Sequence, residues 1–182
     1  MTTLPRVTEL LRILSDDYAD VPQAPLQRAQ ERGTALHGLC CQHLASMMDL
    51  CPKPAEIDAE YVAGYMGFLE WVEKNDVRPI LVETPSINEK DGYIGTPDAL
   101  VRYGDDGPIV LVDLKFTAAL FRKNHVQLLA YWKMKGYTEA KQAVLLQINH
   151  ETGKWEEIEV QQNPRDWVAF KSALNIYHWR QA

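Results

Sequence analysis

Apolar residues recur at helical spacing through the first 75 residues and predict three helices. The first is expected over 7–19, the second over 26–50 and the third over 56–75. Pro52 and Pro54 follow the second helix. Because proline removes a backbone donor and clashes with the preceding turn, we expect this helix to end before them.

The pattern changes at residue 79, where short apolar runs alternate with turn residues. These runs predict five strands, over 79–87, 96–104, 108–116, 143–150 and 151–160. The run IVLV at 109–112 is apolar on both faces, which is typical of a central strand covered on both sides. Helical spacing returns over 121–136, inside the sheet region, and again over 164–180 at the C-terminus.

This order of elements predicts an α/β (α+β) fold with a central mixed β-sheet flanked by helices. Residues 1–78 are expected to be mostly helical and residues 79–160 to form the sheet with its inserted helix. A single domain over 1–182 is expected, because this length suits one sizeable core and no Gly/Ser-rich linker divides the chain.

Composition narrows the class of protein. Hydrophobic residues make up 46% and charged residues 24%, which is typical of a globular protein and excludes a disordered or fibrous chain. The longest apolar runs, at 80–82 and 109–112, are too short to cross a bilayer, so we expect no membrane association. The first 17 residues lack the pattern of a signal peptide, which predicts a cytoplasmic location.

Charge and cysteine content restrict the binding chemistry further. The net charge of −6 argues against a protein that coats nucleic acid over its whole surface, but it allows a local basic groove or a carboxylate site for cations. The three cysteines, Cys40, Cys41 and Cys51, match neither a disulfide framework nor a zinc-binding spacing. We expect them to be buried free thiols.

The strongest candidate for chemistry combines two acidic residues and a lysine on neighbouring predicted strands. Asp98 lies in GTPD, and Asp113 and Lys115 lie in VDLKF. A short turn between antiparallel strands brings Asp98 and Asp113 together, and Asp113 and Lys115 share a face because they are two residues apart. Leu114 points to the other face and leaves its backbone carbonyl available to a cation. Alternatively, D-x-K is an ordinary salt bridge at the end of a strand.

Energetic reasoning favours a metal at this position. Two carboxylates at the end of a hydrophobic strand repel each other and resist desolvation. A hard divalent cation removes both penalties, and Mg²⁺ or Mn²⁺ binds through one or two carboxylates together with waters and phosphate. Lys115 beside such a cation would orient or deprotonate a water, or stabilise a pentavalent phosphate.

The order Gly95-Thr96-Pro97-Asp98, a hairpin, an apolar run and then Asp113-Leu114-Lys115 resembles the PD-(D/E)XK nuclease superfamily. Two further fragments are similar to its RecB-like exonuclease branch, which includes stand-alone nuclease domains of phages and prophages. They are Gly33-x-x-x-His37 and Gln127-x-x-x-Tyr131. The matches cover residues 33–131 in the expected order. The resemblance implies a restriction-endonuclease-like core with an N-terminal helical segment.

The same resemblance implies a role for each matching residue. Asp98, Asp113, the carbonyl of Leu114 and His37 would hold one or two ions, and Lys115 would be the catalytic lysine. Glu83 matches a glutamate near the metal or DNA, or is a plain residue at a strand end. Gln127 and Tyr131 would line the site and touch the DNA backbone, although Tyr131 could equally pack in the core. Thr117 would bind phosphate, while His37 could also be an ordinary polar helix residue.

Basic residues gather around and after the third predicted strand, with Phe116 and Phe121 between them: Arg122, Lys123, Lys133, Lys135 and Lys141. This pattern predicts a groove that follows phosphates, and its alternative is a solvated helix face. Cysteine is absent after Cys51, and no Walker A sequence occurs, so we expect neither an iron–sulfur cluster nor a built-in ATPase motor.

Taken together, the sequence predicts a Mg²⁺- or Mn²⁺-dependent DNA exonuclease that acts on linear single- or double-stranded DNA in phage or bacterial recombination, repair or replication. A single-strand annealing or recombination protein is a candidate partner, and an oligomer is allowed. The alternatives are an endonuclease of the same superfamily, including a restriction-type or tRNA-processing enzyme, and a non-catalytic nucleic-acid-binding subunit with the same fold.

Overall fold

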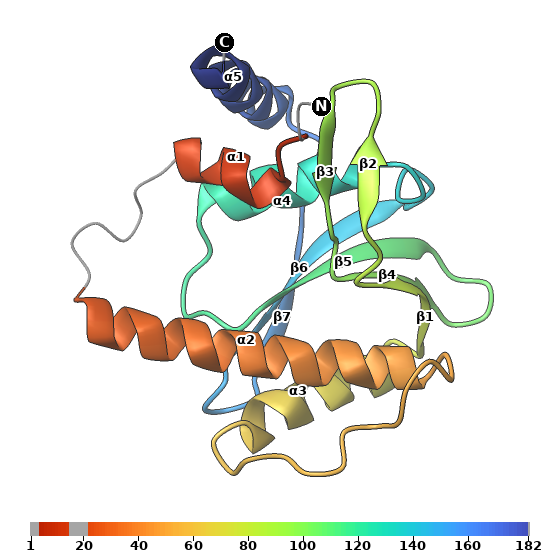
Figure 1. Cartoon of the computed structure of the whole chain (residues 1–182). Coiled ribbons are helices and arrows are strands. Elements are labelled where there is room, and N and C mark those ends of the chain that lie inside the picture. The colour runs from red at the N-terminus through yellow and green to blue at the C-terminus, as the bar shows by residue number, and fades with distance from the viewer. Residues whose placement is uncertain (1–3, 15–21, 182) are drawn as a thin grey trace.

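The computed structural model describes residues 4–14 and 22–181, and these form five helices and seven strands (Figure 1). The helices are α1 (Val7–Leu14), α2 (Gln23–Ser46), α3 (Val62–Lys74), α4 (Arg122–Trp132) and α5 (Pro164–Gln181). The strands are β1 (Val77–Val82), β2 (Ser86–Asn88), β3 (Tyr93–Gly95), β4 (Ala99–Tyr103), β5 (Ile109–Lys115), β6 (Gln142–Ile148) and β7 (Trp155–Glu159).

Five of these strands form one mixed sheet in the order β1-β4-β5-β6-β7. Only the β5–β6 pair is parallel, because α4 carries the chain back over the sheet between them. The expected α/β fold with a mixed sheet flanked by helices is therefore confirmed. Strand β5, which contains the apolar run, lies in the middle of the sheet as expected.

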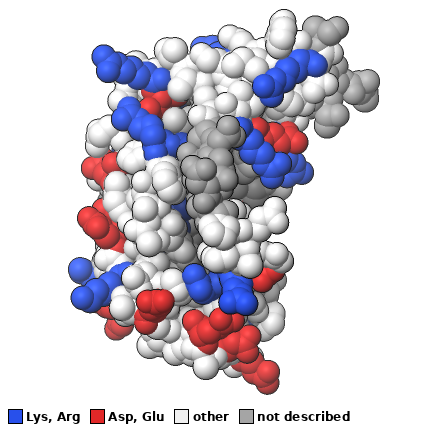
Figure 2. All heavy atoms as spheres, turned by 90° about the vertical axis from the view of Figure 1, so that its left-hand side faces the viewer, with Lys and Arg blue, Asp and Glu red and all other residues white. Residues whose placement is uncertain are grey.

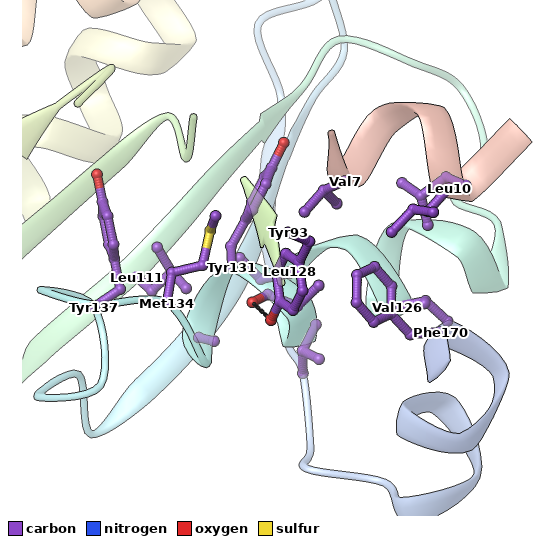
Figure 3. Close-up of a cluster of buried hydrophobic side chains, with 14 of the residues drawn as sticks. Val7, Leu10, Tyr93, Leu111, Val126, Leu128, Tyr131, Met134, Tyr137 and Phe170 are labelled. Carbon is purple, nitrogen blue, oxygen red and sulfur yellow. Dashed lines mark hydrogen bonds between the residues drawn. The ribbon is translucent and has the colours of Figure 1, made fainter. Parts of the chain in front are cut away.

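Helices cover both faces of the sheet. Helices α2 and α3 lie against one face, while α1, α4 and α5 lie against the other (Figure 1). Side chains alternate between the two layers: Leu100 and Leu111 belong to the α4 side, whereas Ala99, Val110 and Val112 belong to the α2 side. Figure 3 shows the α4-side core, in which α1, α4 and α5 meet around Tyr93 and Phe170.

Several predicted elements differ from the structure in extent. The strand expected over 79–87 is broken at Glu83, whose backbone has a φ of 41°. Its last two residues belong to β2, which pairs with β3 in a separate two-stranded sheet. The helix expected over 56–75 begins only at Val62, and the one expected over 26–50 ends at Ser46. The structure describes the first predicted helix over Val7–Leu14, and the remainder of its predicted range lies outside the described residues.

Within the described ranges, no helix combines the length and the apolar character needed to span a membrane.

Candidate metal centre and active site

The hairpin of β4 and β5 places the two acidic residues side by side. Ala99 is paired with Val112, so Asp98 and Asp113 are the next pair beyond the last one in the ladder. The backbone N–H of Leu114 donates to Asp98 Oδ2 at 2.7 Å, which ties the GTPD segment to the end of β5. Leu114 itself is buried in the α2-side core, while Asp113 points to the α4 side.

The negative charge of the buried Asp113 carboxylate is only partly compensated by the residues around it. Its side chain is 1% exposed, and Lys115 Nζ lies 2.6 Å from its Oδ2. Neither of its oxygens receives a hydrogen bond of normal geometry from any described residue. Burial raises the pKa of Asp113 above its ordinary value, Lys115 acts in the opposite direction, and the charge of Asp98 adds to the increase. An additional positive charge at this position would remove that penalty.

His37 reaches the pair from α2. Its Nε2 lies 3.0 Å from Asp98 Oδ1. The hydrogen bond to Asp98 raises the pKa of His37 to about 11. Burial works to raise the pKa of Asp98, but His37, Lys115 and the N–H of Leu114 outweigh it and lower the pKa. Two cationic side chains, His37 and Lys115, therefore stand next to the two carboxylates.

Glu83 lies at the open side of this cluster. Its Oε1 is 3.9 Å from His37 Nδ1, and its side chain is 53% exposed. The backbone N–H of Glu83 donates to the carbonyl of Asp98 at 2.8 Å. This bond helps to hold Glu83 in the left-handed conformation that breaks the strand, a conformation that residues other than glycine adopt infrequently.

Sequence reasoning missed one member of this cluster, Cys41. Its Sγ lies 3.7 Å from His37 Nε2, and ligand atoms of His37, Cys41 and Glu83 all lie within 4.8 Å of one another. Burial raises the pKa of Cys41 to about 11, so its thiol is protonated at neutral pH. The signal that could have found it is the spacing of four residues from His37 on one helix. Cys40 and Cys41 are buried free thiols as expected, but Cys51 is only partly buried.

Gln127 and Tyr131 extend the cluster along α4. Gln127 Oε1 accepts from Lys115 Nζ at 3.3 Å, and Gln127 Nε2 donates to the Tyr131 hydroxyl at 3.2 Å. Tyr131 is only 3% exposed and stands among the core residues labelled in Figure 3, so it reaches the site through Gln127. Gly95 makes room for it, because a Cβ at that position would lie 2.7 Å from the Tyr131 ring.

The other predicted DNA-binding residues lie beyond Lys115. Thr117 donates its hydroxyl to the carbonyl of Ala119. Arg122 forms an ion pair with the largely buried Asp166 of α5 at 2.7 Å. Lys123 Nζ lies 5.6 Å from the centroid of the Phe121 ring. The structure thus holds Arg122 against α5 and keeps Lys123 near Phe121.

Basic residues do not gather into one groove. Lys133 and Lys135 line a separate hollow of about 600 Å³ beside the β2–β3 hairpin, where Lys133 lies over the ring of Trp167. This hollow is larger than the space beside Lys115 but contains none of the predicted site residues. Figure 2 shows basic and acidic side chains interspersed on one face, with no continuous basic band among the described residues seen there.

No model of a known protein family matches the sequence, and no curated protein sequence matches it. Solved structures with a similar arrangement include an alkaline exonuclease, LHK-Exo, from Laribacter hongkongensis, with 12% identity, a TM-score of 0.49 and coverage of 81% of this chain and 77% of that one. LHK-Exo in complex with dAMP has 10% identity, a TM-score of 0.40 and coverage of 80% and 90%. The crystal structure of SSO0001 has 14% identity, a TM-score of 0.41 and coverage of 81% and 87%. At these values the likeness carries no information about what this chain acts on.

The donor set at the end of β5 fits a hard divalent cation. Asp98 and Asp113 offer carboxylate oxygens next to each other at the ends of β4 and β5, and no described residue gives the oxygens of Asp113 a hydrogen bond of normal geometry. Carboxylate and carbonyl oxygens are the ligands preferred by Mg²⁺ and Mn²⁺. His37 would add an imidazole nitrogen after releasing its proton, and Glu83 adds a partly exposed carboxylate at the rim. The residues present therefore match the expected metal, and Cys41 is the single soft donor among them.

Proposed function

We propose that this protein is a Mg²⁺- or Mn²⁺-dependent deoxyribonuclease that hydrolyses phosphodiester bonds. The observation that carries the proposal is the buried Asp113, whose oxygens lack normal hydrogen bonds, next to Asp98 and within 2.6 Å of Lys115. A buried carboxylate beside a second, partly buried carboxylate and a lysine is costly for stability alone, and it matches the requirements of metal-assisted phosphate chemistry.

In this proposal Asp98, Asp113 and the carbonyl of Leu114 hold the cation, with His37 and Glu83 beside it. When bound, the metal would supply Lewis-acid activation of the scissile phosphate and lower the pKa of a water. Lys115 is positioned between Asp113 Oδ2 and Gln127 Oε1. From there it directs positive charge toward the phosphate, or takes a proton from the attacking water. Gln127 positions Lys115, and Tyr131 positions Gln127.

Exonuclease action on linear DNA is the preferred form of this activity. Its support is the resemblance of the ordered residues His37, Asp98, Asp113, Lys115, Gln127 and Tyr131 to the RecB-like branch. The same resemblance supports a role in phage or bacterial recombination, repair or replication in the cytoplasm, with a single-strand annealing protein as a partner and an oligomer as a possible assembly.

The test is degradation of end-labelled linear duplex and single-stranded DNA, with covalently closed circles as the control substrate. It uses Mg²⁺, Mn²⁺ and EDTA, and compares the wild type with Asp113→Asn and Lys115→Ala. We expect metal-dependent loss of linear DNA only, and a decrease of about 10³-fold or more in both variants, because each removes a group from the reacting centre.

Unchanged thermal unfolding of the variants would show that the loss is chemical. Cleavage of circles would make the protein an endonuclease. Cleavage by Asp113→Asn at the wild-type rate would refute the proposed site, and absence of any metal-dependent cleavage would favour a non-catalytic DNA-binding subunit.

A further inference from the structure

A groove of about 360 Å³ runs between α2 and the segment from Leu114 to Asn124. His37 and Lys115 form part of its wall, so it is continuous with the candidate metal centre.

Gly33 places no side chain on the α2 wall of this groove. It lies in the middle of α2, and a Cβ built on it meets no atom within 4 Å. Its backbone is helical, so neither packing nor a left-handed conformation requires glycine here. Glycine within a helix reduces helix stability relative to alanine. What the missing side chain does provide is open space in the groove.

An aromatic ring faces this space from the other wall. Phe121 is 36% exposed, and its backbone N–H donates to Asn124 Oδ1 at 2.8 Å, which fixes Phe121 at the start of α4. The preceding loop is anchored as well, because Gln147 Nε2 donates to the carbonyl of Thr117 at 2.7 Å. The ring therefore sits on a wall whose backbone is already ordered.

The described lining of the groove is polar and includes a cation. It combines side chains such as Gln30, Thr34 and Thr117 with Lys115. A polar groove with a cationic residue and an aromatic wall has the chemistry of a site for single-stranded nucleic acid, in which bases stack on rings.

We propose that the groove binds one unpaired nucleotide next to the scissile phosphate, with its base against Phe121 and its sugar-phosphate passing over Gly33. The substrate class is then DNA that is single-stranded at the cleaved position, because a base that enters the groove to stack on Phe121 must separate from its pairing partner. This inference rests on the proposed nuclease function, since it takes Lys115 as the position of the phosphate.

The experiment fills the groove with one side chain. Gly33→Leu places a good helix former in the open space, and Gly38→Leu is its matched control, because Gly38 lies in the same helix with no atom near its Cβ position and is not part of the groove lining. Binding of a fluorescent single-stranded oligonucleotide is measured in EDTA, so that cleavage plays no part. We expect about tenfold weaker binding for Gly33→Leu and a change of less than about twofold for Gly38→Leu.

A second pair of variants tests the stacking. An oligonucleotide that carries 2-aminopurine at the terminal position reports stacking through quenching of its fluorescence. We expect the wild type and Phe121→Tyr to quench it, and Phe121→Ala to lose both the quenching and about tenfold in affinity. Thermal unfolding checks that every variant is folded, and Gly33→Leu should unfold at or above the wild-type temperature.

The outcomes separate this inference from the proposed function. Equal binding by wild type and Gly33→Leu, or equal loss in Gly33→Leu and Gly38→Leu, overturns the groove, even if the wild type cleaves DNA. Blunt duplex that competes as well as single-stranded DNA overturns the substrate class. If the expected pattern of binding holds but no metal supports cleavage, the groove stands and the nuclease proposal is wrong.

Discussion

At the scale of single residues, the buried carboxylate of Asp113 lowers the stability of the fold and at the same time provides a place where a cation would bind. A carboxylate with 1% exposure and no normal hydrogen bonds is unfavourable in a folded protein, and the nearby Asp98 increases the repulsion. Lys115 and His37 offset part of this cost in the protein alone. An arrangement of this kind is expected where an additional cation completes the balance, which is why Asp113 carries the functional proposal.

The first prediction at this scale concerns Tyr131, because only the side chain of Gln127 lies between it and Lys115. Tyr131→Phe keeps the buried ring but removes the hydroxyl to which Gln127 donates. Gln127 then holds Lys115 less firmly, and we expect cleavage to fall by about 2- to 13-fold, the equivalent of one hydrogen bond of about 0.5–1.5 kcal/mol. Single-turnover cleavage at saturating DNA measures this effect.

Tyr137→Phe is the matched control for this variant. Its hydroxyl is also engaged, since it donates to the carbonyl of Thr84 at 2.8 Å, and its ring is buried in the same core. Both variants should lose similar stability, but only Tyr131→Phe should slow cleavage. An equal decrease in both would mean that Tyr131 acts through the fold and not through Gln127.

At the scale of elements, α3 and the turn between β6 and β7 are in direct backbone contact. A Cβ on Gly67 of α3 would lie 2.0 Å from the carbonyl oxygen of Gly153 in that turn. Backbone atoms cannot move aside as a flexible side chain can. Gly67 therefore sets the distance at which α3 packs on the sheet. Gly153 itself has a φ of 70°, a left-handed conformation that favours glycine at this position as well.

Gly67→Ala and Gly38→Ala are expected to change stability in opposite directions. Gly67→Ala forces α3 away from the turn and should lower the free energy of unfolding by about 1–3 kcal/mol or more. Gly38→Ala meets open space in α2 and should raise it by up to about 1 kcal/mol, through better helix propensity. Urea unfolding of both variants measures these changes, and a neutral Gly67→Ala would show that this contact is loose.

Features that depend on residues close together in the sequence could be predicted, whereas features that depend on contacts between distant elements could not. The hairpin that joins Asp98 to Asp113 was predictable, because a short turn and the alternation of apolar residues fix its register. The break at Glu83 was not, because its left-handed backbone is supported by a bond to Asp98 from a different strand. Cys41 was missed because its role depends on where α2 crosses the sheet, and local spacing alone does not determine that position.

At the scale of the whole molecule, the site lies where the two layers of helices meet at one end of the sheet. Helices α2 and α4 lie on opposite faces of the sheet (Figure 1). His37 of α2 contacts Asp98 before β4, and Gln127 of α4 contacts Lys115 at the end of β5. Each layer packs on its own core, so the distance between His37 and Gln127 is fixed only when both layers are docked. Formation of the site is therefore coupled to folding of the entire sheet.

This coupling predicts that a metal stabilises the whole fold. A cation that binds the assembled site but not the unfolded chain adds about 2.7 kcal/mol when its concentration is 100 times its dissociation constant. For a chain of 182 residues this corresponds to an increase of about 5–10 °C in the unfolding temperature on addition of Mn²⁺, which EDTA should reverse. Asp113→Asn should abolish the increase, whereas Glu139→Gln, which removes an exposed carboxylate outside the site, should keep it. An increase that persists in Asp113→Asn would place the metal elsewhere. If the wild type shows none at millimolar Mn²⁺, Asp98 and Asp113 are neutralised by His37 and Lys115 alone.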